Sequence, residues 1–268
     1  GQTYPQERFE ILVVDNDPAD HTLPNTPNTN LRILREDTPG SYAARNTGIT
    51  SSQGELLAFC DADCWPCPSW IEQAVRFFAS RPDCSRLAGK IELALADNKY
   101  VSLAELYETI FAFRQEDYAQ QGVSATANMC SHRQVFQSVG LFDEALLSGG
   151  DLEWGQRASQ TGSVIGYAPE VLVLHQARHS VQELVHKAKR VCSGYIVLNK
   201  AQLATHPGSA LYHGFCMLKP PIKAGQMIFA RHDLPARKRV VLYGLEYLLK
   251  LIQFKEYARL QLGGKPTR

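Results

Sequence analysis

The chain has 268 residues, 44% of them hydrophobic, which is enough to bury a sizeable core in one domain or in one domain with an extension. The net charge of +1 hides an asymmetry, because residues 1–180 carry 13 Lys and Arg against 23 Asp and Glu, whereas residues 181–268 carry 15 against 4. A basic tail on an acidic body indicates that the tail meets an anionic surface, either a membrane or a nucleic acid.

The seven cysteines argue against a disulfide framework, because an odd number in a chain of this size is typical of a reducing compartment. Cys64-Trp65-Pro66-Cys67 has the CxxC spacing, and with Cys60 it is compatible with a zinc or redox site. No second CxxC pair or spaced histidine pair follows in the sequence, so small buried thiols are the favoured interpretation.

In chain order, the first predicted strand is the apolar run Ile11 to Val14, which ends in Asp15. An acidic side chain at the carboxyl end of a strand can accept hydrogen bonds from a base or a ribose hydroxyl. A cap on the turn Asn16-Asp17-Pro18 is an equally good interpretation. A short helix is predicted from Ser41, its N-cap, and carries Arg45, whose planar guanidinium suits a diphosphate but is also common on a solvated helix.

The next strand, Leu56 to Phe59, follows Gly54 and has the pattern of a strand buried on both faces in a parallel sheet. Asp61 and Asp63 come directly after it, at the sheet edge where open α/β folds bind ligands. A hard divalent cation such as Mg²⁺ or Mn²⁺ relieves the repulsion between two carboxylates and keeps coordination positions for phosphate oxygens. Taken alone, the two aspartates also fit an acidic turn.

Together these segments resemble the family 2 glycosyltransferases, which have the GT-A fold. The resemblance rests on the order of Ile11 to Asn16, Ala44-Arg45-Asn46-Thr47-Gly48, Gly54 to Phe59 and Asp61-Ala62-Asp63. It implies that Asp15 binds the nucleobase of a nucleotide-sugar donor and that Arg45 lies beside the nucleotide. By the same resemblance, Asp61 and Asp63 face the ribose and the metal. The family's usual first strand and helix precede the matched region, so we expect the chain to be N-terminally incomplete.

The resemblance continues from Ala125 to His175. It places Asn128, in a strand of small residues, beside the donor or acceptor sugar. The segment Gly150-Asp151-Leu152-Glu153 matches an acidic segment of the family, with Gly150 where Glu is common, and Asp151 falls on the position of the general base. Such a base takes the proton of an acceptor hydroxyl in an inverting transfer. Glu153 is the second choice, and a helix cap is the alternative role of Asp151.

A further strand, Gly166 to Leu174, ends in His175. A histidine there is ordinarily a core or loop residue, but many GT-A enzymes place a late histidine on the metal, and neutral imidazole is a suitable ligand. The predicted metal ligands are therefore Asp63, Asp61 and His175, for Mn²⁺ or Mg²⁺. The apolar spacing also predicts helices from Trp70 to Ser80 and from Ala104 to Tyr118.

Residues 181–268 lie beyond the GT-A pattern. In Val240 to Leu262, behind the triplet Arg237-Lys238-Arg239, apolar residues recur at helical spacing. Charges interrupt this helix too often for it to span a bilayer, which needs roughly 20 apolar residues. It fits a basic helix on an anionic membrane surface or, equally well, one packed on the catalytic domain. We expect no nucleic acid, because the tail has no basic motif interleaved with aromatic residues.

The sequence thus predicts an α/β fold of GT-A type over 1–180, with a mostly parallel sheet flanked by helices, and a basic helical extension over 181–268. The predicted function is that of a metal-dependent inverting glycosyltransferase, which moves a sugar from a nucleotide-diphosphate sugar to a hydroxyl of a glycan or lipid-linked acceptor. We expect it to be peripheral on the cytoplasmic face of a bacterial membrane, in polysaccharide synthesis. The alternatives are a non-catalytic GT-A-like membrane-associated scaffold and a GT-A-like nucleotidyltransferase.

Overall fold

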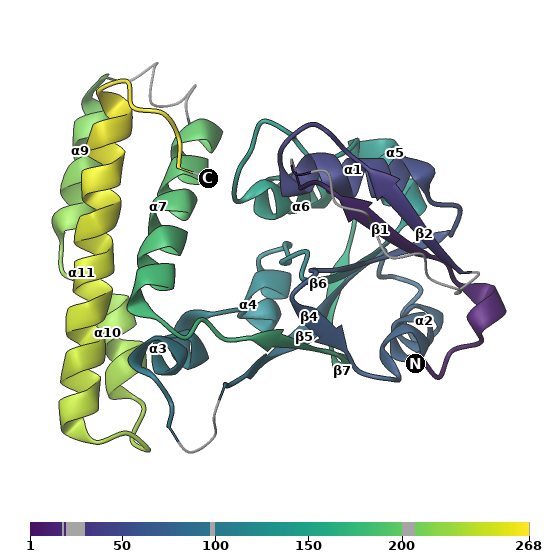
Figure 1. The fold of residues 1–268 in the computed structure, drawn as a ribbon, viewed down its shortest axis with the longest axis horizontal. Helices are drawn as coiled ribbons and strands as arrows, with labels where there is room; N and C mark the ends of the chain where they lie inside the picture. The colour runs from purple at the N-terminus through teal and green to yellow at the C-terminus, as the bar shows by residue number, and fades with distance from the viewer. Residues whose placement is uncertain (18, 20–29, 97–99, 200–206, 268) are drawn as a thin grey trace. The chain divides into compact units, whose positions relative to one another are not determined.

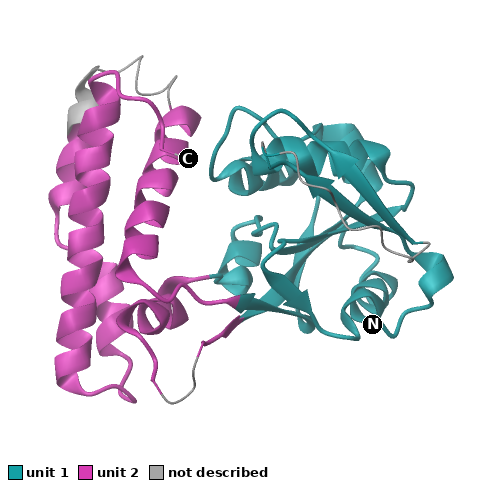
Figure 2. Ribbon diagram, viewed as in Figure 1, with its two compact units in different colours: residues 1–92, 113–175 teal, residues 93–112, 176–268 magenta. Residues whose placement is uncertain are grey.

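The computed structural model describes residues 1–17, 19, 30–96, 100–199 and 207–267. The chain forms two compact units, which Figure 2 distinguishes by colour. The first unit contains residues 1–92 and 113–175, and the second contains residues 93–112 and 176–268. The predicted division of the chain at residue 180 into two domains stays a prediction.

The first unit combines strands with short helices (Figure 1). In chain order its elements are η1 (Gln6–Arg8), β1 (Ile11–Asp15), β2 (Leu31–Arg35), α1 (Ser41–Ser51), β3 (Leu56–Cys60), β4 (Cys64–Pro66), α2 (Trp70–Ser80), β5 (Arg86–Ala94), α4 (Gln115–Gln120), β6 (Asn128–His132), α5 (Arg133–Val139), α6 (Gly150–Gln160) and β7 (Ile165–Gln176). The last residues of β5 and β7 already belong to the second unit.

This unit contains a small parallel sheet and a larger sheet with antiparallel pairs. Strands β1 and β2 pair in parallel, with Asp15 opposite Arg35. The larger sheet has the order β3-β6-β5-β7-β4, and within it the pairs β3–β6, β5–β6 and β4–β7 are antiparallel. The prediction that Leu56 to Phe59 lies in a parallel sheet, buried on both faces, is therefore wrong. Ala58 is exposed, and a short apolar run does not by itself distinguish an edge strand from a central one.

Helix α2 supplies one wall of the core of the first unit. Its observed bounds, Trp70–Ser80, are the predicted ones. Trp70, Ala74, Phe77 and Phe78 recur every three or four residues and are buried against the sheet, where Leu87, Val171 and Val173 are also buried. This core fixes the ends of β4 and β7, which carry the candidate metal ligands.

The second unit is helical. Its elements are α3 (Leu103–Phe111), α7 (Val181–Leu198), α9 (Pro207–Leu218), α10 (Ile222–Phe229) and α11 (Ala236–Gln261). The prediction of one helix from Ala104 to Tyr118 is wrong, because α3 ends at Phe111 and α4 begins at Gln115. Between them Phe113 has a φ of 51°, a conformation that bulky residues rarely adopt and that breaks the helix.

Helix α11 buries one face and leaves apolar side chains on another. Leu245 and Leu249 pack with Ala104, Leu184 and Ala188 in a core of the second unit. In contrast, Val240, Val241, Leu248 and Leu251 are exposed, so the predicted apolar face is only partly covered. Among the described residues, no helix is long and apolar enough to cross a membrane.

Two buried glutamates on α3 are fully hydrogen-bonded. Glu108 accepts from the Arg178 backbone N–H at 2.9 Å and its guanidinium at 2.8 Å, and from Lys187 at 3.0 Å. Glu105 accepts from the backbone N–H groups of Ala96 at 2.8 Å and Ser102 at 2.7 Å. Burial opposes the charge of Glu105, but these hydrogen bonds outweigh burial and hold its pKa at about 2.

We expect Glu105→Gln to lower the free energy of unfolding at pH 7 by on the order of 3 kcal/mol, because one pKa unit corresponds to about 1.4 kcal/mol. Since the folded pKa lies below the unfolded value, this stability is present above about pH 4.5 and is lost as the pH falls toward 2. Urea unfolding between pH 2 and 7 measures it. The control is Glu116→Gln, which neutralises an exposed carboxylate. If the free energy of unfolding of Glu105→Gln depends on pH as that of the parent chain does, the prediction is contradicted.

Candidate active site

Helix α1 carries two side chains that link the separate parts of the site. The helix begins at Ser41, and Gly40, with φ of 145°, takes the N-cap position, so the predicted cap at Ser41 lies one residue inside the helix. Tyr42 is buried, and Arg45 has a side chain that is 18% exposed. The Arg45 guanidinium carbon lies 5.4 Å from the centre of the Tyr42 ring, so the two side chains are stacked neighbours on one face of α1.

Arg45 binds the first of the two predicted aspartates. Its Nη2 lies 2.5 Å from Asp61 Oδ1, and Asp61 directly follows β3. The fork of Arg45 can bind one carboxylate and still offer donors to a second anion. Asp61 and Arg45 therefore form a charged pair at the end of β3.

Asp63 lies in a different group, with Cys64 and His175. His175 Nε2 is 3.3 Å from Asp63 Oδ2, and one ligand atom from each of the three residues lies within 4.8 Å of the others. The register of β4 and β7 creates this group, because it sets Cys64 opposite His175. The His175 side chain is 4% exposed and packs against the Phe113 ring at a tilt of 49°, with ring centres 4.5 Å apart, whereas the Asp63 side chain is 62% exposed.

The donor atoms of this group suit a divalent transition metal. Carboxylate oxygen and imidazole nitrogen are ligands for Mn²⁺, whereas Mg²⁺ prefers oxygen ligands alone. Asp61 does not belong to the group, so of the three predicted metal ligands the structure brings Asp63 and His175 together. Cys64 joins them at a position that the sequence suggested only as part of a CxxC motif. The pKa of its thiol is raised by a hydrogen bond with Cys60 and by burial.

Asp151 is the second residue of α6. Its Oδ1 accepts a hydrogen bond from the Tyr42 hydroxyl at 3.2 Å, and its Oδ2 accepts from the Thr126 backbone N–H at 3.4 Å. The N-cap of α6 is Gly149, and no side chain caps it, so the alternative role of Asp151 as a helix cap does not hold. The carboxylate is half-buried, and its Oδ1 also accepts a hydrogen bond from the Leu152 backbone N–H at 3.1 Å.

Tyr42 is the functional neighbour that the sequence did not indicate. Its hydroxyl also accepts a hydrogen bond from the Gly150 backbone N–H at 2.8 Å, and burial raises its pKa, which keeps the hydroxyl proton available to Asp151. A Cβ atom on Gly150 would lie 2.7 Å from the Tyr42 ring. Glycine at 150, where the resemblance leads one to expect Glu, is therefore what allows Tyr42 to reach Asp151. In the sequence, only the Gly149-Gly150 pair indicates that another side chain packs closely against the start of α6.

Glu153 is occupied by another partner. It forms two hydrogen bonds with the guanidinium of Arg157, at 2.6 and 3.0 Å, one turn along α6. Such a bidentate pair lowers the availability of the carboxylate as a base. This arrangement favours Asp151 over Glu153, the second choice.

The remaining predicted residues, Asp15 and Asn128, have clear neighbours. Asp15 ends β1 and pairs with Arg35, and the backbone N–H of Asp17 lowers its pKa by hydrogen bonding at 3.1 Å. Asn128 is fully buried and donates both amide protons to backbone carbonyls, those of Lys90 at 2.7 Å and Val171 at 2.8 Å. Asn128 thus ties the sheet together, and its predicted contact with a sugar stays a prediction.

Comparison with known proteins decides the family. Residues 2–131 match the family described as glycosyl transferase family 2. The glycosyltransferase AglE of Haloferax volcanii is 38% identical over 203 residues, which cover 73% of this chain and 66% of AglE. The chain belongs to glycosyl transferase family 2.

A second relative comes from Methanococcus voltae. It is the dolichyl N-acetyl-alpha-D-glucosaminyl phosphate 3-beta-D-2,3-diacetamido-2,3-dideoxy-beta-D-glucuronosyltransferase, 22% identical over 201 residues, which cover 69% of this chain and 62% of the relative. The chain therefore spans less than two thirds of the length of each of these two relatives.

A solved structure supports the fold of this family 2 chain. The mannosyltransferase PcManGT from Pyrobaculum calidifontis, in complex with GDP-Man and Mn²⁺, superposes with a TM-score of 0.57 at 16% identity, covering 98% of this chain and 80% of the mannosyltransferase. The α/β prediction of GT-A type is confirmed, with a long C-terminal helix. The sheet is mixed and not mostly parallel as predicted, because the pairs β3–β6, β5–β6 and β4–β7 are antiparallel.

We expect Tyr42→Phe to lower the transfer rate of this family 2 chain about three- to tenfold with little change in donor affinity. The substitution removes one hydrogen bond to Asp151, which is worth about 1 kcal/mol, and leaves the ring in place. Steady-state rates at saturating donor measure the effect. Tyr167→Phe, at a half-buried tyrosine of the same unit, is the matched control, and equal rates for parent and Tyr42→Phe would show that Tyr42 does not position the base.

Proposed function

We propose that this chain contains the catalytic region of a metal-dependent, inverting glycosyltransferase that uses a nucleotide-diphosphate sugar. The observation that carries the proposal is the continuous series of contacts from Asp61 through Arg45 and Tyr42 to Asp151. It joins an acidic strand end to a second carboxylate, which is half-buried. A transferase needs both features close together, one for the leaving diphosphate and one for the incoming hydroxyl.

The donor half of the proposed site combines cationic and acidic groups. Asp63 and His175 would hold Mn²⁺, and Arg45 would offer guanidinium N–H groups to the diphosphate. Bound there, the metal ion supplies positive charge that stabilises the departing nucleotide. Asp15, at the end of β1, would accept a hydrogen bond from the base, and the Asp17 backbone N–H together with Arg35 favours the charged form of its carboxylate. The donor half thus uses residues from four strand ends and α1.

The acceptor half of the proposed site centres on Asp151. As the acceptor oxygen forms its bond to the anomeric carbon, the carbon–oxygen bond to the diphosphate breaks and the electron pair leaves with the nucleotide. Asp151 takes the hydroxyl proton in the same step. Attack from the face opposite the leaving group inverts the anomeric configuration. Tyr42 and the Thr126 N–H orient the carboxylate for this transfer.

The acceptor in the proposed reaction is a hydroxyl of a lipid-linked sugar or glycan. Support comes from the relative in Methanococcus voltae, whose name describes transfer to a dolichyl phosphate-linked sugar. The excess of Lys and Arg in residues 181–268 supports peripheral binding to an anionic leaflet, where each nearby cation contributes about 1 kcal/mol. We propose that the enzyme binds the cytoplasmic face of the membrane, because its proposed donor is a nucleotide sugar.

A thermal-shift panel tests the proposed donor class. The full chain is heated with UDP-, GDP- and dTDP-sugars, each with Mn²⁺ and with EDTA. A ligand at 100 times its dissociation constant stabilises a protein by about 2.7 kcal/mol, so binding raises the melting temperature visibly. We expect a Mn²⁺-dependent rise for sugars of one nucleotide. No rise with any nucleotide sugar would instead support a non-catalytic scaffold.

A further inference from the structure

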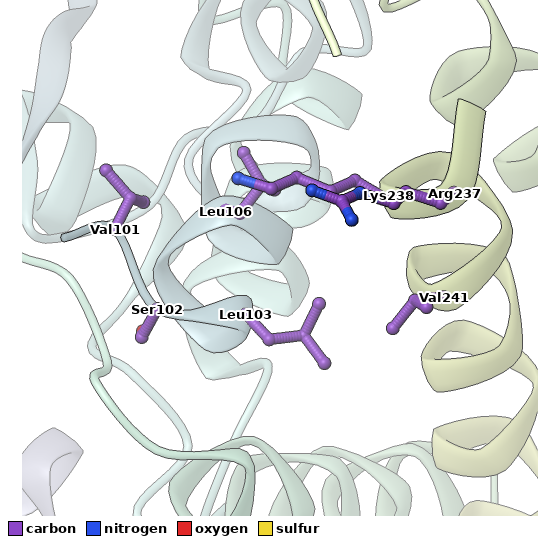
Figure 3. A pocket seen from close by; sticks show the side chains of 7 residues that line it. All are labelled: Val101, Ser102, Leu103, Leu106, Arg237, Lys238 and Val241. Carbon is purple, nitrogen blue, oxygen red and sulfur yellow. The ribbon is translucent and has the colours of Figure 1, made fainter. Parts of the chain in front are cut away.

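A pocket in the second unit shares no residue with the proposed active site, whose residues belong to the first unit. Its volume is about 310 Å³, near the lower limit of small-molecule sites. Figure 3 shows its lining residues: Val101, Ser102, Leu103 and Leu106 from α3 and the segment before it, and Arg237, Lys238 and Val241 from α11. The pocket is therefore built by the first turns of two helices that belong to the same unit.

The pocket combines an apolar wall with two cations. Leu106 is buried and Leu103 is half-buried, and together with Val101 and Val241 they line a surface without charge. Arg237 and Lys238 are exposed, and their side chains extend from α11 toward α3 in Figure 3. Within the described ranges neither cation has an ion-pair partner, whereas the nearby Arg231 pairs with Asp233 at 2.7 Å.

The surface beside the pocket is apolar as well. Val240 is 60% exposed and Val241 52% exposed, next to the two cations in sequence, and Tyr100, 72% exposed, directly precedes the pocket wall. Exposed aliphatic and tyrosine side chains next to Lys and Arg are typical of segments that lie in the membrane interface. A soluble anion such as inorganic phosphate would use the cations but leave these apolar side chains in water.

We propose that this pocket binds an anionic membrane lipid, with the lipid phosphate on Arg237 and Lys238 and the first carbons of the chain against Leu103, Leu106 and Val241. Arg can bind two phosphate oxygens at once, and Lys adds a compact charge. Burial of each adjoining methylene group raises affinity about fourfold, which separates a lipid from a free phosphate. The proposal goes beyond sugar transfer and depends only on the second unit.

Binding of decyl phosphate to the full chain tests this site. The titrations use decyl phosphate below its micelle concentration, inorganic phosphate, and decyl maltoside as the uncharged amphiphile. We expect decyl phosphate to bind at least about tenfold tighter than either of the others, because it alone offers both parts of the ligand. The double variant Arg237→Gln/Lys238→Gln should weaken decyl phosphate binding on the order of thirtyfold, the loss of two cations near a phosphate.

Two further variants separate this site from general charge and from misfolding. Val241→Asn removes an exposed apolar contact and should weaken decyl phosphate but not inorganic phosphate. Lys255→Gln neutralises an exposed cation farther along α11 and should bind like the parent chain. The same variants are then compared on vesicles of phosphatidylglycerol and of phosphatidylcholine. The parent chain should bind only the phosphatidylglycerol vesicles, and the double variant should lose this binding.

Two results would overturn the proposal. Equal affinity for decyl phosphate and inorganic phosphate would show that the cations bind phosphate alone. Parent-like binding of decyl phosphate by the double variant would place lipid binding elsewhere. Both results would leave the nucleotide-sugar panel unaffected, since none of the substituted residues lies among those proposed to bind donor, metal or acceptor hydroxyl.

Discussion

Replacing Asp151 with asparagine is expected to lower the transfer rate by about 10²- to 10⁴-fold and to leave donor affinity within about twofold of the parent value. Asparagine keeps the shape of the side chain and can still accept from the Tyr42 hydroxyl, which lies 3.2 Å from the carboxylate. It has no basic oxygen to take the acceptor proton. The loss should therefore fall on the rate at saturating donor and acceptor, which radiolabelled transfer measures.

Glu153→Gln is the matched control for this substitution. It neutralises a carboxylate on the same helix, one that is already bound by Arg157 at 2.6 Å. The half-exposed ion pair contributes little to stability, so the control should keep most of the parent rate. If Asp151→Asn transfers sugar at the parent rate, or if Glu153→Gln shows the larger loss, Asp151 is not the base.

Replacing Asp63 with alanine is expected to weaken Mn²⁺-dependent binding of the nucleotide sugar by about a hundredfold or more. Even outer contacts to a metal ligand are worth about ten- to a hundredfold in metal affinity, so the loss of a direct carboxylate ligand should exceed that range. Because the Asp63 side chain is 62% exposed, the melting temperature without ligand should change little. Isothermal titration of the donor with Mn²⁺ and with EDTA separates the metal-dependent part.

Asp83→Ala is the control for the metal assignment. Asp83 is an exposed carboxylate of the same unit, paired with Arg81 at 3.2 Å and outside the Asp63 group. It should bind the donor like the parent chain. Unchanged Mn²⁺-dependent affinity in Asp63→Ala would exclude Asp63 as a metal ligand. Asp61, whose carboxylate binds Arg45 in the structure, would then be the remaining predicted carboxylate ligand.

Features set by local sequence were predictable. The helix Trp70–Ser80 has the expected bounds because its buried side chains repeat every three or four residues, a pattern that needs no knowledge of the partner surface. The strand that ends in Asp15 was also found, and the strand predicted from Gly166 to His175 lies within β7 (Ile165–Gln176), since each is an apolar run with a polar end. Family resemblance then indicated which polar ends belong together.

Features set by distant contacts were not predictable. The break at Phe113 depends on a φ of 51° and on a ring contact with His175, far along the chain. The direction of β3 depends on its pairing with β6, which the residues of β3 alone do not reveal. The separation of Asp61 from Asp63, one on Arg45 and the other beside His175, is likewise decided by which strands adjoin their loop.

The contact between Tyr42 and Asp151 shows the same limit within the candidate site. The two residues are 109 positions apart in the chain, so no local pattern connects them. Only Gly150, whose missing side chain makes room for the Tyr42 ring, left a mark in the sequence. The residue type of Asp151 was thus predictable from resemblance, but the group that orients it required the three-dimensional structure.

The most direct test of the account is the anomeric configuration of the first sugar product. The chain, Mn²⁺ and the nucleotide sugar that stabilises it are mixed with a lipid-linked acceptor, and proton NMR records the anomeric configuration of the transferred sugar in the product. Direct displacement with Asp151 as base predicts the configuration opposite to that of the donor. A product with the donor's configuration, or no product from a donor that binds with Mn²⁺, would contradict the account.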